Sequence, residues 1–256
     1  MYIIKLKITS PSASLPDIFH YVGYYLRLLY KNTQIINNEL QYEATENGVM
    51  LNLYCPEKDS YKDKNASYYA INAKNNFPTE LELNLTFELV GLDPELGKTF
   101  IPKKSTHYIL TEPLDGNWSP LICGDTYNQI PLYKIPFTYE GKSHQEINYW
   151  EYNYRSIKTL WHIGYGQDRW TLNQLQNYKS ELNQKGVSCC RQIEKVTNIP
   201  TYYFLFNDRA WGKTKDKSRK CPGCGKDWFI PDSTNNNLVA FKCDDCRLVS
   251  QLSSRY

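Results

Sequence analysis

Hydrophobic and polar residues alternate strictly from Glu80 to Val90, with leucine and phenylalanine on one side and mostly polar residues on the other. A period of two over this length predicts a half-buried β-strand. A shorter alternation over Tyr2–Ile8 predicts a second strand. Apolar residues recur at intervals of three and four over Leu15–Tyr30, after Ser14 as helix cap and with Pro16 in the first turn. This pattern predicts an amphipathic helix.

Two further runs predict a hairpin, because Ile36–Glu43 and Val49–Tyr54 flank the turn dipeptide Asn47–Gly48. A weaker helical pattern covers Ala66–Lys74. The predicted order is therefore strand, helix, strand, strand, helix, strand. This order is typical of a ferredoxin-like fold, which we expect to fill residues 1–92.

Residues 93–208 are expected to form a connecting region followed by a helical module. The first part is rich in proline and glycine and holds three short strand-like runs: His107–Thr111, Leu121–Cys123 and Pro131–Ile135. Helical spacing then recurs in three segments: Ser143–Gly164, Thr171–Asn183 and Val187–Val196. The apolar run Tyr202–Phe206 predicts a buried strand that ends this region.

Two Cys-x-x-Cys pairs, separated by eighteen residues, dominate the chemistry of residues 209–256. This spacing lets two tight turns direct four sulfurs at one metal ion, and it predicts a closed, structural site for one zinc ion. Short strands are expected at Trp228–Ile230, Leu238–Phe241 and Leu248–Val249, which completes a zinc ribbon. Two disulfides are the less favoured alternative. The four predicted ligands are Cys221, Cys224, Cys243 and Cys246.

Charge is distributed unevenly along the chain. Residues 209–256 contain ten basic and five acidic residues, a net charge of +5, whereas the other 208 residues contain 20 basic and 22 acidic ones, a net charge of −2. A cationic stretch with an aromatic residue inside it is typical of segments that follow a phosphate backbone and stack on a base. A solvated linker is the equally open alternative. The candidate nucleic-acid-binding residues are Arg209, Trp211, Lys213, Lys215, Lys217, Arg219 and Lys220.

The sequence contains none of the common catalytic or nucleotide-binding motifs, so we expect no enzyme activity and no small-molecule substrate. Cys123 with His107, His144 or His162 is a less favoured catalytic alternative, because each histidine is isolated in sequence. The chain lacks the charged start and apolar run of a signal peptide and has no apolar stretch of membrane-spanning length. These features favour a cytoplasmic protein without a membrane partner.

Five motifs carry a resemblance to a known family: Ser119–Asp125, Pro131–Tyr133, Pro200–Tyr203, Cys221–Gly225 and Phe241–Ser250. Together they resemble an uncharacterised bacterial family of zinc-ribbon-containing proteins, a domain-of-unknown-function family for which nucleic-acid binding has been suggested. The resemblance implies a zinc ribbon and no established reaction. Relatives often carry a second cysteine where this chain has Thr126, which argues against a second metal site at Cys123.

The sequence leaves two functions open. In the first, the basic segment and the ribbon bind nucleic acid, preferably single-stranded. In the second, the protein is an interaction module, such as an immunity, antitoxin-like or adaptor protein, whose N-terminal part binds a protein partner. The expected fold class is α+β, with a ferredoxin-like part, a helical module and a zinc ribbon.

Overall fold

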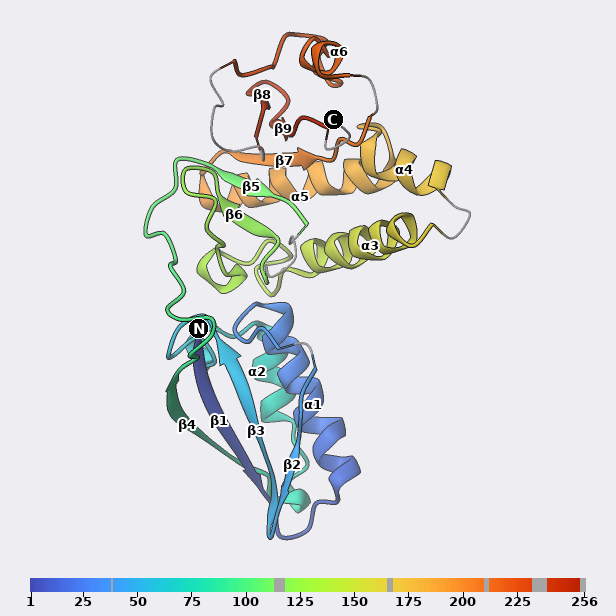
Figure 1. Cartoon of the computed structure of the whole chain (residues 1–256). Coiled ribbons are helices and arrows are strands. Elements are labelled where there is room, and N and C mark those ends of the chain that lie inside the picture. Colours follow the sequence, from blue (N-terminus) through green and yellow to red (C-terminus); the bar gives the residue numbers. More distant parts are fainter. Residues whose placement is uncertain (38, 113–117, 165–167, 210–211, 232–238, 254–256) are drawn as a thin grey trace. The chain divides into compact units, whose positions relative to one another are not determined.

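The computed structural model describes residues 1–37, 39–112, 118–164, 168–209, 212–231 and 239–253. The chain divides into two compact units. The N-terminal unit comprises residues 1–101 and 129–144, and the C-terminal unit comprises residues 102–128 and 145–256. Both contain a sheet and helices, so the protein is of mixed α+β class (Figure 1).

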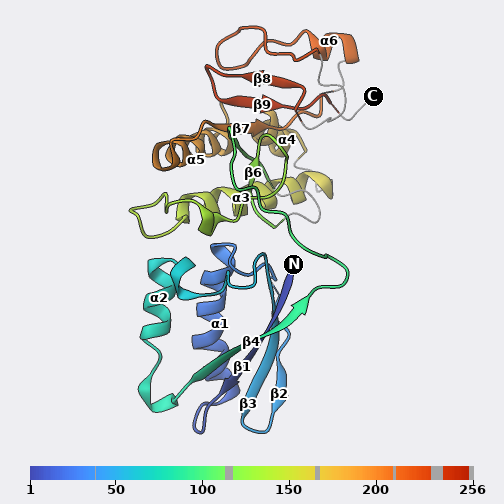
Figure 2. The same cartoon turned by 90° about the vertical axis from the view of Figure 1, so that its left-hand side faces the viewer.

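The N-terminal unit has an antiparallel sheet in the order β2-β3-β1-β4. Two helices, α1 and α2, lie along one face of it (Figure 2). Buried apolar residues of β1, β3 and α1 form the core between these layers. The bounds are β1 Tyr2–Thr9, α1 Leu15–Lys31, β2 Glu43–Thr45, β3 Gly48–Cys55, α2 Tyr68–Asn75 and β4 Asn84–Leu92.

The helix predicted over Leu15–Tyr30 is confirmed as α1. Ser14 caps the helix and forms a reciprocal capping box with Asp17, which satisfies backbone donors that the first turn leaves open. The expected strand over Ile36–Glu43 is wrong for most of its length, since β2 starts only at Glu43. Its place is taken by irregular chain, in which the side-chain amide of Asn37 bonds to the backbone of β3.

A returning segment, residues 129–144, also belongs to this unit. The Leu132 backbone N–H donates to the Thr33 hydroxyl at 2.5 Å, and the Tyr133 hydroxyl donates to Glu57 at 2.8 Å. The strand expected at Pro131–Ile135 is wrong, because Leu132–Lys134 forms a 3₁₀ turn after Pro131. Hydrogen bonds to the end of α1, rather than strand pairing, hold this segment.

The C-terminal unit has a mixed sheet in the order β6-β5-β7-β9-β8. The central strand β7 runs parallel to both β5 and β9, while the outer pairs are antiparallel. Every strand except β7 has only three residues. The bounds are β5 Tyr108–Leu110, β6 Leu121–Cys123, α3 Gln145–His162, α4 Asp168–Gln176, α5 Glu181–Thr197, β7 Thr201–Leu205, α6 Lys213–Lys217, β8 Phe241–Cys243 and β9 Leu248–Ser250.

The helix expected over Thr171–Asn183 is wrong in its second half, because α4 ends at Gln176 and α5 begins at Glu181. The side-chain amide of Asn183 donates to three carbonyls at the end of α4, and Ser180 caps α5. These local hydrogen bonds stabilise the break between α4 and α5, which the spacing of apolar residues does not indicate. The strand expected at Trp228–Ile230 is reduced to one bridge, between Phe229 and Phe241.

β7 connects the expected helical module to the cysteine-rich tail. It pairs with β5 on one side and with β9 on the other, and apolar residues from both parts share one core. The expected boundary between residues 208 and 209 therefore runs through a single sheet. Among the described residues, no helix is both long and apolar enough to cross a membrane.

Candidate metal centre

The first cysteine pair lies in a tight loop. The Gly225 N–H donates to the Cys221 carbonyl at 2.8 Å, and the Cys221 N–H donates to the Lys226 carbonyl at 2.9 Å. Gly225 has φ +75°, a left-handed conformation that glycine adopts without steric cost. The loop therefore turns back on itself with Cys221 buried and Cys224 exposed.

The second pair repeats this geometry at the β8–β9 turn. Arg247 stands directly after Cys246, as Gly225 stands after Cys224, and it also has positive φ, at 52°. A non-glycine residue in this region is strained. Its guanidinium is held by Glu194 of α5, with Nε to Oε2 and Nη2 to Oε1 both at 3.1 Å, and it also donates to the Asp244 carbonyl. These charged bonds offset the strain and tie the turn to α5.

All four sulfurs lie within 4.8 Å of one another, and the Cys224 and Cys243 sulfurs are 3.6 Å apart. Gly223 makes this approach possible, because a Cβ at its position would be 2.6 Å from the Cys246 sulfur. All eight cysteines of the chain are free thiols. The four sulfurs can therefore hold a metal ion, and each of them was expected from the sequence.

The electrostatics of the cluster favour a cation at its centre. Burial raises the pKa of the Cys243 thiol to about 11 and that of Cys246 further still. The Lys226 backbone N–H lowers the pKa of the exposed Cys224. Cys243 and Cys246 would thus be protonated at neutral pH without a compensating charge. A bound metal ion supplies that charge and deprotonates its thiol ligands.

The basic segment is not an extended solvated linker. It contains the short helix α6, and the buried carboxylate of Asp216 in this helix accepts bonds from Asn207 and from the Ser253 N–H. Arg219 forms an ion pair with Asp216 at 3.1 Å, and its guanidinium lies 3.8 Å from the centre of the Phe241 ring. The structural role of the Asp216–Arg219 pair was not predicted from the sequence, because Asp216 is a single acidic residue among many lysines.

The candidate nucleic-acid-binding residues consequently divide into two groups. The Arg219 side chain is only 6 % exposed and donates to Ser250, so it serves the fold rather than a surface contact. Arg209 is half-buried and donates to the Gln176 carbonyl. Trp211 lies outside the described residues. The exposed members are Lys213, Lys215, Lys217 and Lys220.

The alternative constellation around Cys123 is partly assembled. The Cys123 sulfur donates to the Asp125 carboxylate at 3.6 Å, and His107 Nδ1 is 3.9 Å from the other oxygen of that carboxylate. Cys123 is fully buried, and burial lowers the pKa of His107. His144 lies in the other unit and His162 ends α3. Asp125, which connects the thiol and the imidazole, was not anticipated from the sequence.

The described residues thus define a mixed α+β protein with a cysteine cluster that can bind a metal ion. Residues 102–206 match the family model "Domain of unknown function (DUF2310)", and residues 211–256 match "Domain of unknown function (DUF8594)". No solved structure matches the chain.

Two relatives from Haemophilus influenzae, both described as uncharacterized proteins, are similar over much of their length. One is 31 % identical over 228 residues, which cover 87 % of this chain and 86 % of the relative. The other is 32 % identical over 169 residues, which cover 65 % of this chain and 81 % of the relative. The chain belongs to the uncharacterised family of these relatives, marked by the two domains of unknown function.

Proposed function

We propose that the cysteine cluster holds one structural zinc ion and that the fold around it is a zinc ribbon. Four sulfur ligands are typical of structural zinc sites and leave no position for a substrate. The two similar turns and the β8–β9 hairpin support this interpretation. For the N-terminal unit, the strand order β2-β3-β1-β4 supports a ferredoxin-like fold.

We also propose that the C-terminal unit binds single-stranded nucleic acid through the lysines beside the zinc ribbon. The observation that supports this function most is the exposure of the α6 lysines on a segment fixed by the Asp216–Arg219 pair. A fixed segment presents its charges without losing chain entropy on binding. Stacking by Trp211 belongs to the same proposal.

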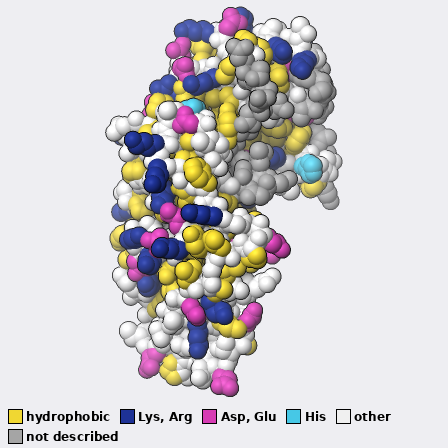
Figure 3. Space-filling view, turned by 60° about the vertical axis from the view of Figure 1, so that its left-hand side comes forward, with side chains coloured by type: hydrophobic (Ala, Val, Ile, Leu, Met, Phe, Trp, Pro, Cys, Tyr) yellow, Lys and Arg dark blue, Asp and Glu magenta, His cyan; other side chains and the backbone are white. Residues whose placement is uncertain are grey.

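The surface charges support a binding mode of modest affinity. On the face drawn in Figure 3, Lys and Arg side chains recur with Asp and Glu among them. Lys220 is itself paired with Asp227 at 2.5 Å, and both side chains are exposed. Binding by scattered lysines is dominated by counterion release, so we expect strong dependence on salt and little dependence on base sequence.

An anisotropy titration of zinc-loaded protein with a mixed-sequence single strand tests this function. Contacts from all four exposed lysines predict a slope of log K against log salt of about −3, at about 0.7 per phosphate. Lys213→Ala and Lys217→Ala should each flatten the slope by about 0.7, whereas Lys7→Ala in β1 should not change it. Absence of binding at low salt, or an equal effect of Lys7→Ala, would refute the proposal.

Protein interaction is the second candidate, and the edge strand β4 favours it. β4 pairs only with β1 among the described strands, and its apolar residues Leu89, Val90 and Leu92 are about half exposed. An open apolar edge is a template for pairing with another chain. If this function holds, a partner co-purified from native cells should be lost with Val90→Lys and retained with Lys213→Ala.

A further inference from the structure

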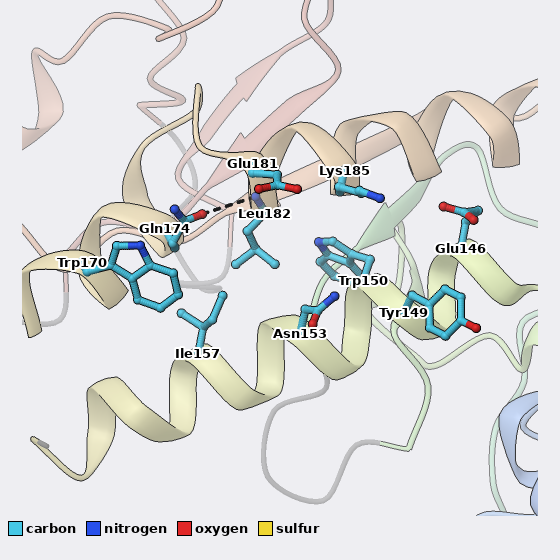
Figure 4. A pocket seen from close by; sticks show the side chains of 10 residues that line it. All are labelled: Glu146, Tyr149, Trp150, Asn153, Ile157, Trp170, Gln174, Glu181, Leu182 and Lys185. Atoms are coloured by element: carbon cyan, nitrogen blue, oxygen red, sulfur yellow. Dashed lines mark hydrogen bonds between the residues drawn. The ribbon is translucent and has the colours of Figure 1, made fainter. Parts of the chain in front are cut away.

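A cavity of about 240 Å³ lies among three helices of the C-terminal unit (Figure 4). It is somewhat smaller than the roughly 300–1,000 Å³ of sites that hold drug-sized molecules, so it suits a smaller ligand. Helices α3, α4 and α5 all contribute to its lining. The cysteine cluster is not part of it, so the cavity raises a separate functional question.

The cavity combines aromatic and aliphatic side chains with the amides of Asn153 and Gln174. Trp150 is 1 % exposed and contacts the rings of Tyr154 and Tyr203, with centroids 5.4 and 5.8 Å away. Leu182 of α5 and Ile157 of α3 add aliphatic surface beside it (Figure 4). An indole fixed in this way needs no reordering when a ligand packs against it, which favours binding.

Two aromatic residues at the rim are unusually exposed. Trp170 of α4 and Tyr149 of α3 line the cavity, yet they are 50 % and 55 % exposed. Large exposed aromatic side chains around a hollow are typical of a recognition surface. Trp150, Trp170 and Tyr149 therefore line one hollow, with Trp170 and Tyr149 on opposite sides of it (Figure 4).

The charged residues of the lining decide which ligand fits. Among the described lining residues, Glu146 and Glu181 are carboxylates, Lys185 is the only basic one, and the net charge is −1. None of the three forms an ion pair within the part of the chain that the structure describes. Carboxylates next to aromatic faces favour a cation, because both attract positive charge. A phosphate or carboxylate ligand would meet two negative charges and one positive.

We propose that this cavity binds a small organic cation, in which an ammonium group is attached to an apolar body. The apolar body packs on Trp150, Leu182 and Ile157. The ammonium group lies towards Glu181, on the side of the cavity where Trp170 contributes cation–π attraction, and Glu146 adds negative charge from the other side (Figure 4). This site lies outside the sequence-based expectation that no small molecule binds.

Titration of the zinc-loaded full chain with 2-phenylethylammonium, followed by the NMR signals of the tryptophan indole N–H groups, tests this assignment. Three matched probes distinguish the contributions: 3-phenylpropionate carries the opposite charge, 2-phenylethanol carries none, and phenylalanine adds a carboxylate. We expect the ammonium to bind at least about tenfold more tightly than the anion and the alcohol, a difference of about 1.4 kcal/mol. Equal affinities for 2-phenylethylammonium, 3-phenylpropionate and 2-phenylethanol would overturn the proposal. Tighter binding of phenylalanine than of 2-phenylethylammonium would overturn it as well.

Variants locate the effect within the cavity. Glu181→Gln should weaken ammonium binding about threefold to tenfold, Glu146→Gln should weaken it less, and Lys185→Gln should strengthen it about threefold. Trp170→Ala should weaken it by a similar factor. Tyr152→Ala is the matched control, because Tyr152 also lies on α3 and is 73 % exposed but does not line the cavity. An equal effect of Tyr152→Ala, or weaker binding with Lys185→Gln, would contradict the assignment.

Discussion

The two units of this protein are stabilised by different interactions. In the N-terminal unit, the eight-residue strands β1 and β3 and the long helix α1 contribute buried aliphatic side chains to one core, and the nine-residue strand β4 packs partly buried side chains against it. In the C-terminal unit, four of the five described strands have three residues. The ion pairs Arg219–Asp216 and Arg247–Glu194 and the cysteine cluster lie next to this sheet. All residues of β5, β6, β7 and β9 are buried, but strands this short form few ladder hydrogen bonds, so specific polar bonds add to apolar packing in fixing their arrangement.

Removal of the proposed zinc ion should have the largest effect, and that effect should be confined to the C-terminal unit. Structural zinc contributes roughly 10 to 16 kcal/mol to the folding of a small domain. We expect a chelator, or Cys243→Ser, to abolish hydrogen-exchange protection in β7, β8 and β9, and to leave β1 and β3 protected. Because β9 pairs with β7, the loss of protection should extend to the central strand β7, which precedes residue 209.

Leu6→Ala is the reciprocal change. Leu6 is fully buried, and truncation should destabilise the N-terminal unit by about 2 to 5 kcal/mol without changing the zinc content. If chelation also abolishes hydrogen-exchange protection in β1 and β3, the two units do not unfold independently. The contrast between their stabilising interactions would then be wrong.

The Arg219–Asp216 pair should come next in magnitude. Arg219→Ala removes a buried ion pair from the Asp216 carboxylate, and breaking such a pair costs about 3 to 5 kcal/mol in comparable cases. Chemical unfolding followed by Trp228 fluorescence measures this loss, since the Trp228 ring lies 4.6 Å from the guanidinium. Lys213→Ala is the control and should change stability by no more than about 0.5 kcal/mol. Similar losses for both variants would show that the pair is unimportant.

The smallest expected effect is a pH dependence of the N-terminal unit. His144 is 2 % exposed, and burial lowers its pKa to about 4, against about 6.5 in an unfolded chain. Between these values the unfolded state binds more protons, so the stability present above pH 6.5 is lost as pH falls towards 4. We expect a loss of about 2 kcal/mol between pH 7 and pH 5.

Urea titrations that follow hydrogen exchange in β1 and β3 measure this loss without interference from the metal site. His144→Leu should remove most of the pH dependence. An unchanged slope in that variant would assign the effect to other groups.

Local patterns were predictable from the sequence, and non-local polar bonds were not. Helix α1 and the four clustered cysteines follow from spacing within a few residues. The pairing of β7 with β5 and β9 could not be predicted, because three-residue strands are too short to show alternation. The structural roles of Asp216 and Glu194 were missed for a different reason, because their partners Ser253 and Arg247 lie 37 and 53 residues away in the sequence.

The position of β7 has a consequence for the growing chain on the ribosome. β7 is synthesised as five consecutive buried residues, but one of its edges is completed only by β9, about 45 residues later. At about 5 to 20 residues per second, this edge stays open for roughly 2 to 9 seconds. An apolar strand with an unpaired edge is prone to aggregate during such an interval. We therefore expect the yield of soluble protein to fall when the cell cannot supply metal to the emerging cysteines.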